Sequence, residues 1–393
     1  MALAWRLRLL YFLYYGATGT LLPYLAPYLR GLGFSGTEIG AVQMLGPLLA
    51  PAAALLWAAL ADRTGRPDRA LRLATGLSAV AALGLPWART PLAVAAVVLL
   101  QAAGDRAVVP LLDSLTLEHV RGRPGATYAR IRLGGSLGFA LLALGTGALL
   151  AWRGDRPADP LLPWLVVALL AGLAAAAQGL RPDGPVHPAR PGWGDLRALL
   201  GSRPLRLLLG ACAVHWLACA PYHLFFGVLV RDRGLPALVT GLGMGAGVAA
   251  EVLALLVFPA LASRFSLRAL FGAAFAASAL RWALLWQASG AAAVIALQLL
   301  HGFTFGLFWG AAMAGMARLV PAPLRTTGQA LFSAIVFGVG NGVGYALSGW
   351  LYDRAGAAAP LFGWSSVIEI ALLIVVVVNR LGPDPAAIPE RNA

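Results

Sequence analysis

The chain has 393 residues, of which 60% are hydrophobic and only 12% are charged, and its formal net charge is +14. Soluble globular domains are about half apolar and about a quarter charged, so this composition excludes a soluble protein and indicates an integral membrane protein. All the basic residues are arginines, and they gather in short segments between apolar runs. Membrane topology therefore explains the net charge, and we expect a lipid bilayer and no nucleic acid as a partner.

Apolar runs long enough to cross a bilayer as helices recur along the whole chain. The first run follows Arg6 and Arg8 as a signal peptide would, but its length and the lack of a small-x-small cleavage site favour a retained helix. We expect twelve spans, near residues 8–29, 38–61, 70–88, 92–117, 127–151, 161–180, 205–229, 237–262, 267–288, 291–317, 326–351 and 358–379.

The arginine distribution predicts the orientation. Arginine is concentrated in the segments that lie inside if the N-terminus is cytoplasmic, which places both termini in the cytoplasm. The longest hydrophilic segment is rich in Pro, Gly and Arg and is expected to link two six-helix halves. The predicted organisation is an N-terminal bundle at 1–180, a cytoplasmic linker at 181–204, a C-terminal bundle at 205–380 and a cytoplasmic tail at 381–393.

The two halves resemble each other in sequence. Gly40 aligns with Gly241 and Arg63 with Arg264 at a shift of 201 residues, and Gln101 aligns with His301 at a shift of 200. A repeat of this size is typical of duplicated transporters, whose solute site lies between the halves near the bilayer midplane. The alternative explanation is chance similarity among helices rich in Ala, Leu and Gly.

Glu251 and Arg281 are ionisable residues inside predicted spans of the second half. Glu251 lies 14 residues before the turn near Phe265, and Arg281 lies 16 residues after it. At 1.5 Å per residue both are about 20–24 Å from the turn, at nearly one depth. Because a charge in a span is costly unless it meets a partner or water, we expect these two to pair and to line the site; a static pair that only fixes helix packing is the alternative.

Asp113 and Arg132 form the corresponding set in the first half. They lie ten residues before and nine residues after Arg123, at about 14 Å from that turn. Arg106 is seven residues from Asp113 on the same helix face and competes for it, which would leave Arg132 free for solute.

His301 lies in the run "QLLHGFTFGLFW" beside further polar and aromatic residues. Aromatic side chains near buried charges predict a pocket for a flat organic solute with a polar or anionic group. Glu369 is interpreted as facing the extracellular end, and His215 and His223 are not placed in the site. The predicted lining residues are Gln298, His301, Phe139, Trp282, Tyr15, Trp216, Phe305 and Trp309.

Several motifs resemble the major facilitator superfamily. "ADRTGRPDR" resembles its loop motif between the second and third helices, which implies a gating role for Asp62, Arg63 and Arg66, and "SRFSLR" resembles a degenerate second copy with Arg264. "VVPLLDSL", "YARIRLGGSLGFALL", "LRWALL" and "LQLLHGFTF" resemble the lactose-permease-like branch, above all its phenylpropionate permease group, with the nucleoside–proton symporters as relatives.

This resemblance spans nearly the whole chain and implies roles for particular residues. It implies proton coupling by Glu251, Asp113 and His301, and solute binding by Arg132 and Arg281. Thr304 replaces the proton-carrying glutamate of lactose permease, and Gln298 replaces a lysine. Phe139 replaces a sugar-stacking tryptophan, which makes a disaccharide a poor candidate.

The predicted fold class is an all-α integral membrane protein of twelve helices in two pseudo-symmetric bundles. We expect a monomeric, multi-pass transporter of the bacterial cytoplasmic (inner) membrane. It would import a small organic solute, an aromatic carboxylate above others, together with protons, by alternating access. The alternatives are a sugar or nucleoside symporter, an exporter on the same fold, and a membrane sensor or lipid-handling protein. No cofactor, metal site or enzyme activity is expected, because no metal cluster, nucleophile elbow or phosphate-binding loop stands in the right context.

Overall fold

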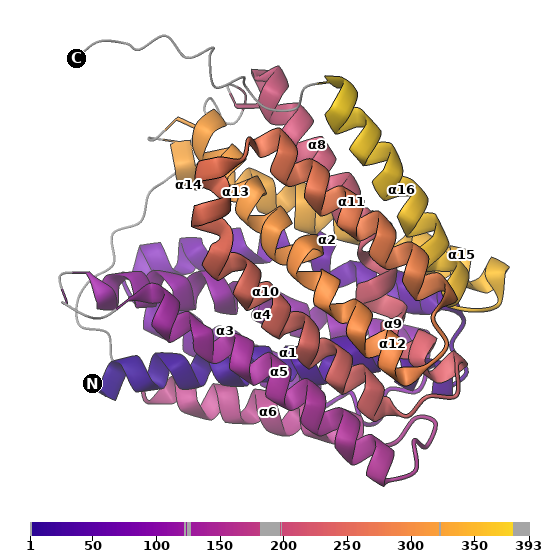
Figure 1. The fold of residues 1–393 in the computed structure, drawn as a ribbon. Helices are drawn as coiled ribbons and strands as arrows, with labels where there is room; N and C mark the ends of the chain where they lie inside the picture. The colour runs from indigo at the N-terminus through magenta and orange to yellow at the C-terminus, as the bar shows by residue number, and fades with distance from the viewer. Residues whose placement is uncertain are drawn as a thin grey trace, which may run out of the picture. The chain divides into compact units, whose positions relative to one another are not determined.

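The computed structural model describes residues 2–121, 123, 127–180, 197, 199–321 and 324–379, and these residues form helices and short connections with no strand among them (Figure 1). The all-α prediction is confirmed for this part of the chain. The predicted tail at 381–393 and most of the predicted linker at 181–204 lie outside the described residues.

Ten helices of the described chain are long and apolar enough to cross a membrane, and each coincides with a predicted span. The other two predicted spans fall on α1 (Ala2–Gly31) and α3 (Pro67–Ala82). Tyrosine, threonine and proline make α1 less apolar than the others, and α3 has only 16 residues. Twelve spans, and cytoplasmic termini, therefore stay predictions.

Local chemistry explains where many helices begin. Thr90, Thr127, Ser202 and Ser266 precede four helices, and each side-chain oxygen accepts a hydrogen bond from a backbone N–H in the first turn. Such capping satisfies amides that have no partner within the helix. Proline occupies the first or second position of three helices, where its missing N–H costs nothing.

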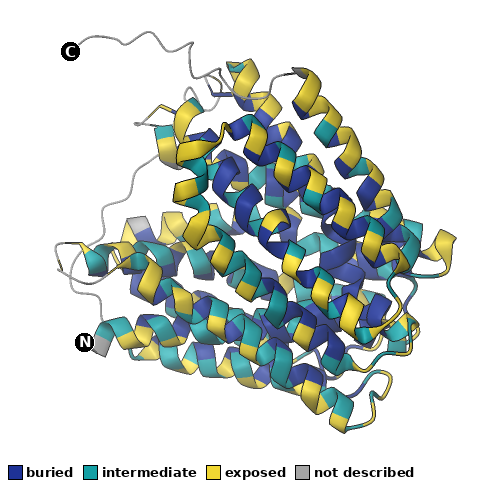
Figure 2. Ribbon diagram, viewed as in Figure 1, coloured by how far each residue is buried: buried dark blue, intermediate teal, exposed yellow. Residues whose placement is uncertain are grey.

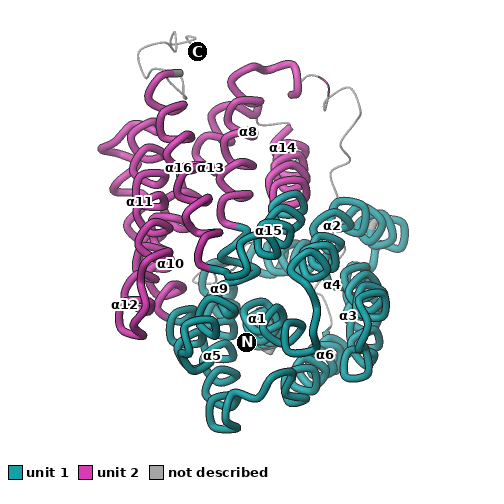
Figure 3. Tube along the Cα trace, turned by 90° about the vertical axis from the view of Figure 1, so that its right-hand side faces the viewer, with its two compact units in different colours: residues 1–189, 220–245, 341–358 teal, residues 190–219, 246–340, 359–393 magenta. Residues whose placement is uncertain are grey.

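The chain divides into two compact units that do not follow chain order (Figure 3). Unit 1 comprises residues 1–189, 220–245 and 341–358, and unit 2 comprises residues 190–219, 246–340 and 359–393. Helix α10 (Ala237–Arg264) contributes to both. The other helices of unit 1 are α1, α2 (Gly36–Thr64), α3, α4 (Pro91–Val120), α5 (Tyr128–Trp152), α6 (Leu161–Gln178), α9 (Ala220–Asp232) and α15 (Asn341–Ala355).

Glycine allows two helices of unit 1 to pack backbone to backbone. A Cβ atom added to Gly349 on α15 would lie 2.2 Å from the carbonyl oxygen of Gly36 on α2, and one added to Gly40 would lie 2.5 Å from the carbonyl oxygen of Tyr345. Close approach through small residues is a common way for membrane helices to associate. The N-terminus of α2 is also capped by Asp353, which accepts from the backbone N–H groups of Gly36 (2.6 Å) and Thr37 (2.7 Å).

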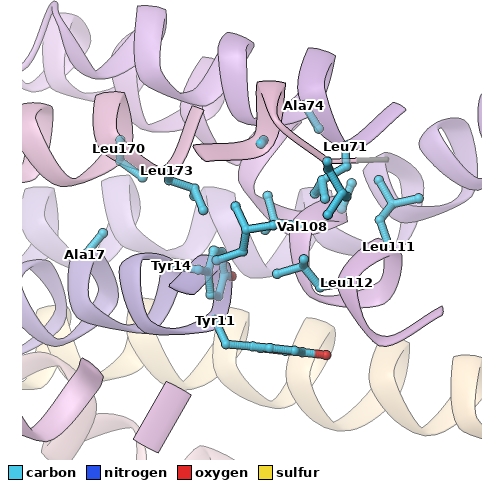
Figure 4. Packing of buried hydrophobic residues seen from close by; sticks show 14 of the residues in the cluster. Tyr11, Tyr14, Ala17, Leu71, Ala74, Val108, Leu111, Leu112, Leu170 and Leu173 are labelled. Carbon is cyan, nitrogen blue, oxygen red and sulfur yellow. The ribbon is translucent and has the colours of Figure 1, made fainter. Parts of the chain in front are cut away.

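The core of unit 1 lies between α1, α3, α4 and α6. Tyr11 and Tyr14 of α1 pack beside Val108 and Leu112 of α4, and all four are buried (Figure 4). Figure 2 shows exposed positions alternating with buried ones along the outer helices. Many of them are large and apolar, such as Leu56 and Leu92, as lipid-facing surfaces require.

Unit 2 contains helices with two irregular stretches. Near His301 the chain passes from a 3₁₀ turn into a π-helical turn, and a second π-helical stretch precedes α15. The π-helical turns widen the helix locally, and they are frequent at functional sites. The elements of unit 2 are α8 (Arg203–Ala218), α11 (Leu267–Gln287), α12 (Ala291–Ala296), η1 (Leu297–Leu300), η2 (Gly302–Leu307), α13 (Phe308–Leu319), α14 (Arg325–Phe332), η4 (Ser333–Gly340) and α16 (Ala359–Asn379).

Candidate functional site

Arg281 of α11 is the most deeply buried charged residue among those predicted to form the site, with 0% exposure. Its guanidinium donates to Oε1 of Gln298 at 2.6 Å and lies 3.1 Å from Nδ1 of His301. The central guanidinium carbon also lies 4.5 Å from the centre of the Trp282 ring. Gln298 is oriented in turn by donating to the backbone oxygen of Val294 at 2.8 Å. Amide, imidazole and indole groups thus offset the cost of burying this cation.

His301 lies between Arg281 and Glu251. Its Nε2 is 3.4 Å from Oε2 of Glu251 on α10, whose side chain is 35% exposed. Arginine can only donate, so Nδ1 of His301 accepts from Arg281 and Nε2 carries the hydrogen that faces Glu251. His301 is therefore a neutral imidazole of one tautomer. The direct pairing of Glu251 with Arg281 stays a prediction, since the measured contacts run through this imidazole.

The irregular backbone around His301 places its neighbours. His301 is the junction between η1 and η2, and its ring stacks on Phe305 with centroids 4.0 Å apart. Thr304, which follows one turn after His301, is buried, and its hydroxyl donates to the backbone oxygen of Leu300. The resemblance leads one to expect a proton-carrying glutamate at this position, and the threonine hydroxyl cannot take that role. The carboxylate that contacts His301 is instead that of Glu251.

Aromatic side chains of unit 2 form a continuous cluster next to His301. The ring of Trp216 on α8 lies 5.0 Å from Phe305 and 4.9 Å from Phe337. Trp309 on α13 stacks on Phe337 with centroids 5.7 Å apart. The structure thus brings together the predicted residues Trp216, Phe305 and Trp309, and Phe337 is a member that the sequence did not reveal.

In unit 1 Asp113 is held by two phenols. Its Oδ1 accepts from the hydroxyl of Tyr11 at 2.5 Å and from that of Tyr128 at 2.8 Å. Thr116 donates to the same Tyr11 hydroxyl at 3.3 Å. An ion pair of Asp113 with Arg132 or with Arg106 stays a prediction.

Arg132 on α5 lies against the tyrosines of α1. Its guanidinium donates to the hydroxyl of Tyr15, and its central carbon lies 4.1 Å from the centre of that ring and 5.3 Å from that of Tyr11. The structure thus places two tyrosines around this cation, the predicted Tyr15 and its neighbour Tyr11. Phe139 lies further along α5, where its backbone carbonyl packs against Gly19 of α1.

The predicted gating loop is centred on a residue that was not among the expected ones. Asp68 accepts from Arg66 at 3.0 Å and from Arg72 at 2.9 Å. Burial alone would raise the pKa of Asp68, but the hydrogen bond and the charges of both arginines lower it below its ordinary value. Arg63 and Arg264 are exposed. The side chain of Asp62 lies outside the described part of the structure.

A cavity of about 300 Å³ in unit 1 is lined by none of the predicted site residues. It lies beside the ends of α1, α5 and α9. Two of its polar side chains are bound to backbone, because Oδ1 of Asp155 accepts from the N–H of Ala237 at 3.0 Å and Arg231 donates to the oxygen of Pro27 at 3.0 Å. These bonds join α9 to α1 and the segment after α5 to the start of α10, which gives both side chains a structural role.

The structure also pairs two residues that the sequence left outside the site. Nδ1 of His215 lies 2.8 Å from Oε1 of Glu369, and both side chains are fully buried. The expectation that Glu369 faces the extracellular end is therefore wrong. Glu369 lies at the middle of α16, on the face toward α8. Cys212 and Cys219 are free buried thiols.

Comparison with known proteins supports the resemblance. The profile of the MFS_1 like family matches residues 4–362. The chain is 32% identical over 374 residues to a maltose permease of Geobacillus stearothermophilus, covering 94% of this chain and 93% of the relative. It is 27% identical over 351 residues to a probable 3-phenylpropionic acid transporter of Escherichia coli (strain K12), covering 88% and 90%.

Solved structures show the same fold. A crystal structure of a variant of the nucleoside transporter NupG superposes with a TM-score of 0.86 at 18% identity, covering 95% of this chain and 99% of the other. The family match and the relatives account for the composition, the apolar helices and the buried charges described above. The chain belongs to the MFS_1 like family and is a multi-pass membrane transporter of the major facilitator superfamily for a small molecule.

Proposed function

We propose that this transporter is a symporter that takes up a small organic solute together with protons by alternating access. The observation that carries the proposal is the position of His301, which contacts Arg281 with one ring nitrogen and faces Glu251 with the other. Through this neutral imidazole, a change of charge on Glu251 alters the surroundings of Arg281. Proton binding and solute binding are then linked at one site.

The link has a simple electrostatic basis. An ionised Glu251 stabilises the hydrogen that His301 directs at it, and this leaves Nδ1 available as an acceptor for Arg281. When Glu251 takes up a proton, the negative charge near the buried guanidinium disappears. A solute with anionic or hydroxyl oxygens then offers Arg281 the acceptors that it needs, by forked hydrogen bonds. Asp113 and Arg132 supply the corresponding charges in unit 1.

The solute that the arrangement favours is an aromatic carboxylate. In each unit a predicted solute-binding arginine lies beside an aromatic ring, Arg132 beside Tyr15 and Arg281 beside Trp282. Rings and a guanidinium together suit a flat solute with an anionic group. The similarity to a probable 3-phenylpropionic acid transporter supports this class.

A saccharide is the second candidate, because the maltose permease is 32% identical over 94% of this chain. Sugars are bound by planar polar side chains and stacked rings, and the present residues offer both. Phe139 in place of the expected tryptophan is the feature that argues against it.

The test is solute uptake by the full chain in proteoliposomes. Labelled 3-phenylpropionate, maltose and uridine are offered with an acidic outside, and then with the pH gradient collapsed by a protonophore. We expect accumulation of 3-phenylpropionate that the protonophore abolishes. Accumulation of maltose instead would select the second candidate. Accumulation that does not depend on the pH gradient would contradict proton coupling. Expulsion of solute driven by the entry of protons would identify an exporter.

A further inference from the structure

His215 and Glu369 form a buried pair that takes no part in the mechanism above. Nδ1 of His215 on α8 and Oε1 of Glu369 on α16 are 2.8 Å apart, and both side chains have 0% exposure. Glu369 lies ten residues from either end of its helix, so its carboxyl group is at the middle of a membrane-spanning segment. Ionisable groups at such positions are rare and mark ion or proton pathways in membrane proteins.

The number of protons on the pair follows from its neighbours. Nε2 of His215 lies 3.0 Å from the backbone oxygen of Thr304, which can only accept, so Nε2 carries a hydrogen. Nδ1 and the carboxyl oxygen must then share one further proton. The pair is either imidazole with carboxylic acid or imidazolium with carboxylate, and in both forms it is neutral overall.

Loss of that proton in place is strongly disfavoured. It would leave a nitrogen lone pair facing a carboxylate, with both groups removed from water. The surroundings are largely apolar, because the ring of Phe308 lies 3.9 Å and that of Phe275 lies 5.4 Å from the imidazole. The proton therefore leaves only when the pair separates or becomes hydrated.

Few titratable or charged groups face the pair. Sγ of Cys219 lies 3.7 Å from Nε2 of His215, and the indole of Trp282 on α11 interacts with the carboxyl group of Glu369. Arg281 acts on the same region through its charge, which reaches Cys219. From η2, the neighbouring group is the backbone oxygen of Thr304.

Two elements join this pair to the cluster around His301. Thr304 belongs to the π-helical turn that begins directly after His301, and a widened turn redirects backbone oxygens away from the regular ladder. Trp282 directly follows Arg281 on α11. Arg281 contacts His301, and Trp282 interacts with Glu369. A shift of η2 or α11 changes both groups at once.

We propose that His215 and Glu369 together form a second proton-binding site of the transporter, which holds one transported proton while it is buried and releases it when the pair is opened. The proposal rests on the proton-coupled uptake proposed above. Among the described carboxylates of unit 2, Glu251 is partly exposed and Glu369 is buried. Coupled transport requires both.

The test compares net accumulation with exchange in proteoliposomes, using labelled 3-phenylpropionate, maltose and uridine. Glu369→Gln keeps a hydrogen-bond donor toward His215 but cannot give up a proton. We expect exchange within about twofold of wild type and pH-driven accumulation lowered at least about tenfold. The matched control is Glu118→Gln, which removes a carboxylate that pairs with Arg121 at the end of α4, and it should leave both measurements unchanged.

Stability measurements test the shared proton independently of the solute. His215→Leu alone leaves the buried carboxyl group of Glu369 without its partner, so its melting temperature should fall well below wild type. Adding Glu369→Leu removes that buried polar group and should recover most of the loss. Losses that simply add in the double variant would overturn the shared-proton arrangement.

The remaining outcomes each decide between the proposals. Wild-type accumulation by Glu369→Gln, or equal loss of exchange and accumulation in a variant that melts like wild type, would reduce the pair to a packing role and overturn this inference. If Glu251→Gln then fails to accumulate solute, the proposed function stands without a proton site at His215 and Glu369. If wild type exchanges a solute but never accumulates it with a pH gradient, both proposals fail.

Discussion

The imidazole of His301 lies 3.1 Å from the guanidinium of Arg281 through Nδ1 and 3.4 Å from the carboxylate of Glu251 through Nε2. Donor chemistry determines the tautomer, because the arginine can only donate. The ring is therefore an oriented connection between a fully buried cation and a partly exposed anion. This relationship gives particular side chains testable roles.

Replacing His301 should break the connection. His301→Leu removes the acceptor of Arg281 and the donor toward Glu251, and a hydrogen bond to a charged group is worth about 1.5–3 kcal/mol. We expect pH-driven accumulation to fall by about ten- to a hundredfold. Uptake in proteoliposomes measures this, with Phe303→Leu on the exposed side of the same turn as the control. Retention of wild-type accumulation would contradict a coupling role.

Arg281 should not tolerate lysine. A guanidinium reaches Gln298 and His301 at once and stacks on Trp282, whereas a single ammonium cannot reproduce this planar geometry. Arg281→Lys should lower the affinity for solute by at least about tenfold. The control is Arg268→Lys at the start of α11, where the half-buried guanidinium donates only to the backbone oxygen of Val377 among the bonds described. Unchanged solute binding in a calorimetric titration would argue against Arg281 as a solute residue.

Two substitutions of Asp113 distinguish the effect of its charge from the effect of its hydrogen bonds. Both phenols donate to the same oxygen, Oδ1, so Asp113→Asn can keep both hydrogen bonds and should melt within a few degrees of wild type. Asp113→Leu leaves Tyr11 and Tyr128 without their acceptor and should cost about 1–3 kcal/mol for each buried hydroxyl. A large loss of stability in Asp113→Asn would show that the charge itself holds unit 1 together.

Close packing of α2 and α15 should make Gly349 intolerant of side chains. A Cβ atom there would lie 2.2 Å from a backbone oxygen, so Gly349→Ala forces the helices apart. Gly145→Ala is the matched control, because nothing lies within 4 Å of its added Cβ. We expect a lowered melting temperature for the first variant and, for the second, a gain of up to about 1 kcal/mol from helix propensity. Equal behaviour of the two would contradict the contact.

The loop around Asp68 should lose stability in acid. Burial opposes its ionisation, but Arg66 and Arg72 outweigh that effect and bring its folded-state pKa below the ordinary value. A carboxylate of this kind contributes stability above its unfolded pKa of about 3.9 and loses it as the pH falls toward the folded value. Melting temperatures of wild type and Asp68→Asn should therefore differ at pH 6, and the difference should shrink as the pH falls below the ordinary carboxyl pKa of about 3.9. A constant difference across this range would contradict the assignment.

The sequence predicted the helices well, and it identified Arg281 as a charge buried within a helix. Long apolar runs leave few structures other than helices, so each expected span coincides with a helix. The hairpin arithmetic likewise placed Glu251 and Arg281 at matching depth, and both face His301. Depth along a helix depends only on residue number and a fixed rise, so it can be read without a structure.

The partners of those charges were harder to predict. Helix rotation and local widening decide which side chains meet, and the π-helical turn after His301 has no reliable sequence pattern. For the same reason the pairing of His215 with Glu369 was missed, although two ionisable residues at the middle of apolar runs were a signal. Tyr11 and Tyr128 were likewise not predicted as partners of Asp113, because phenols that donate to a carboxylate look like ordinary aromatic residues in sequence.

The most direct test of the account is simultaneous recording of luminal pH and solute uptake by Glu251→Gln in proteoliposomes. The account predicts that this variant still exchanges solute, but neither acidifies the lumen during uptake nor accumulates solute when the outside is acidic. Wild-type proton entry and accumulation by the same variant would contradict the assignment of Glu251 as the coupling carboxylate.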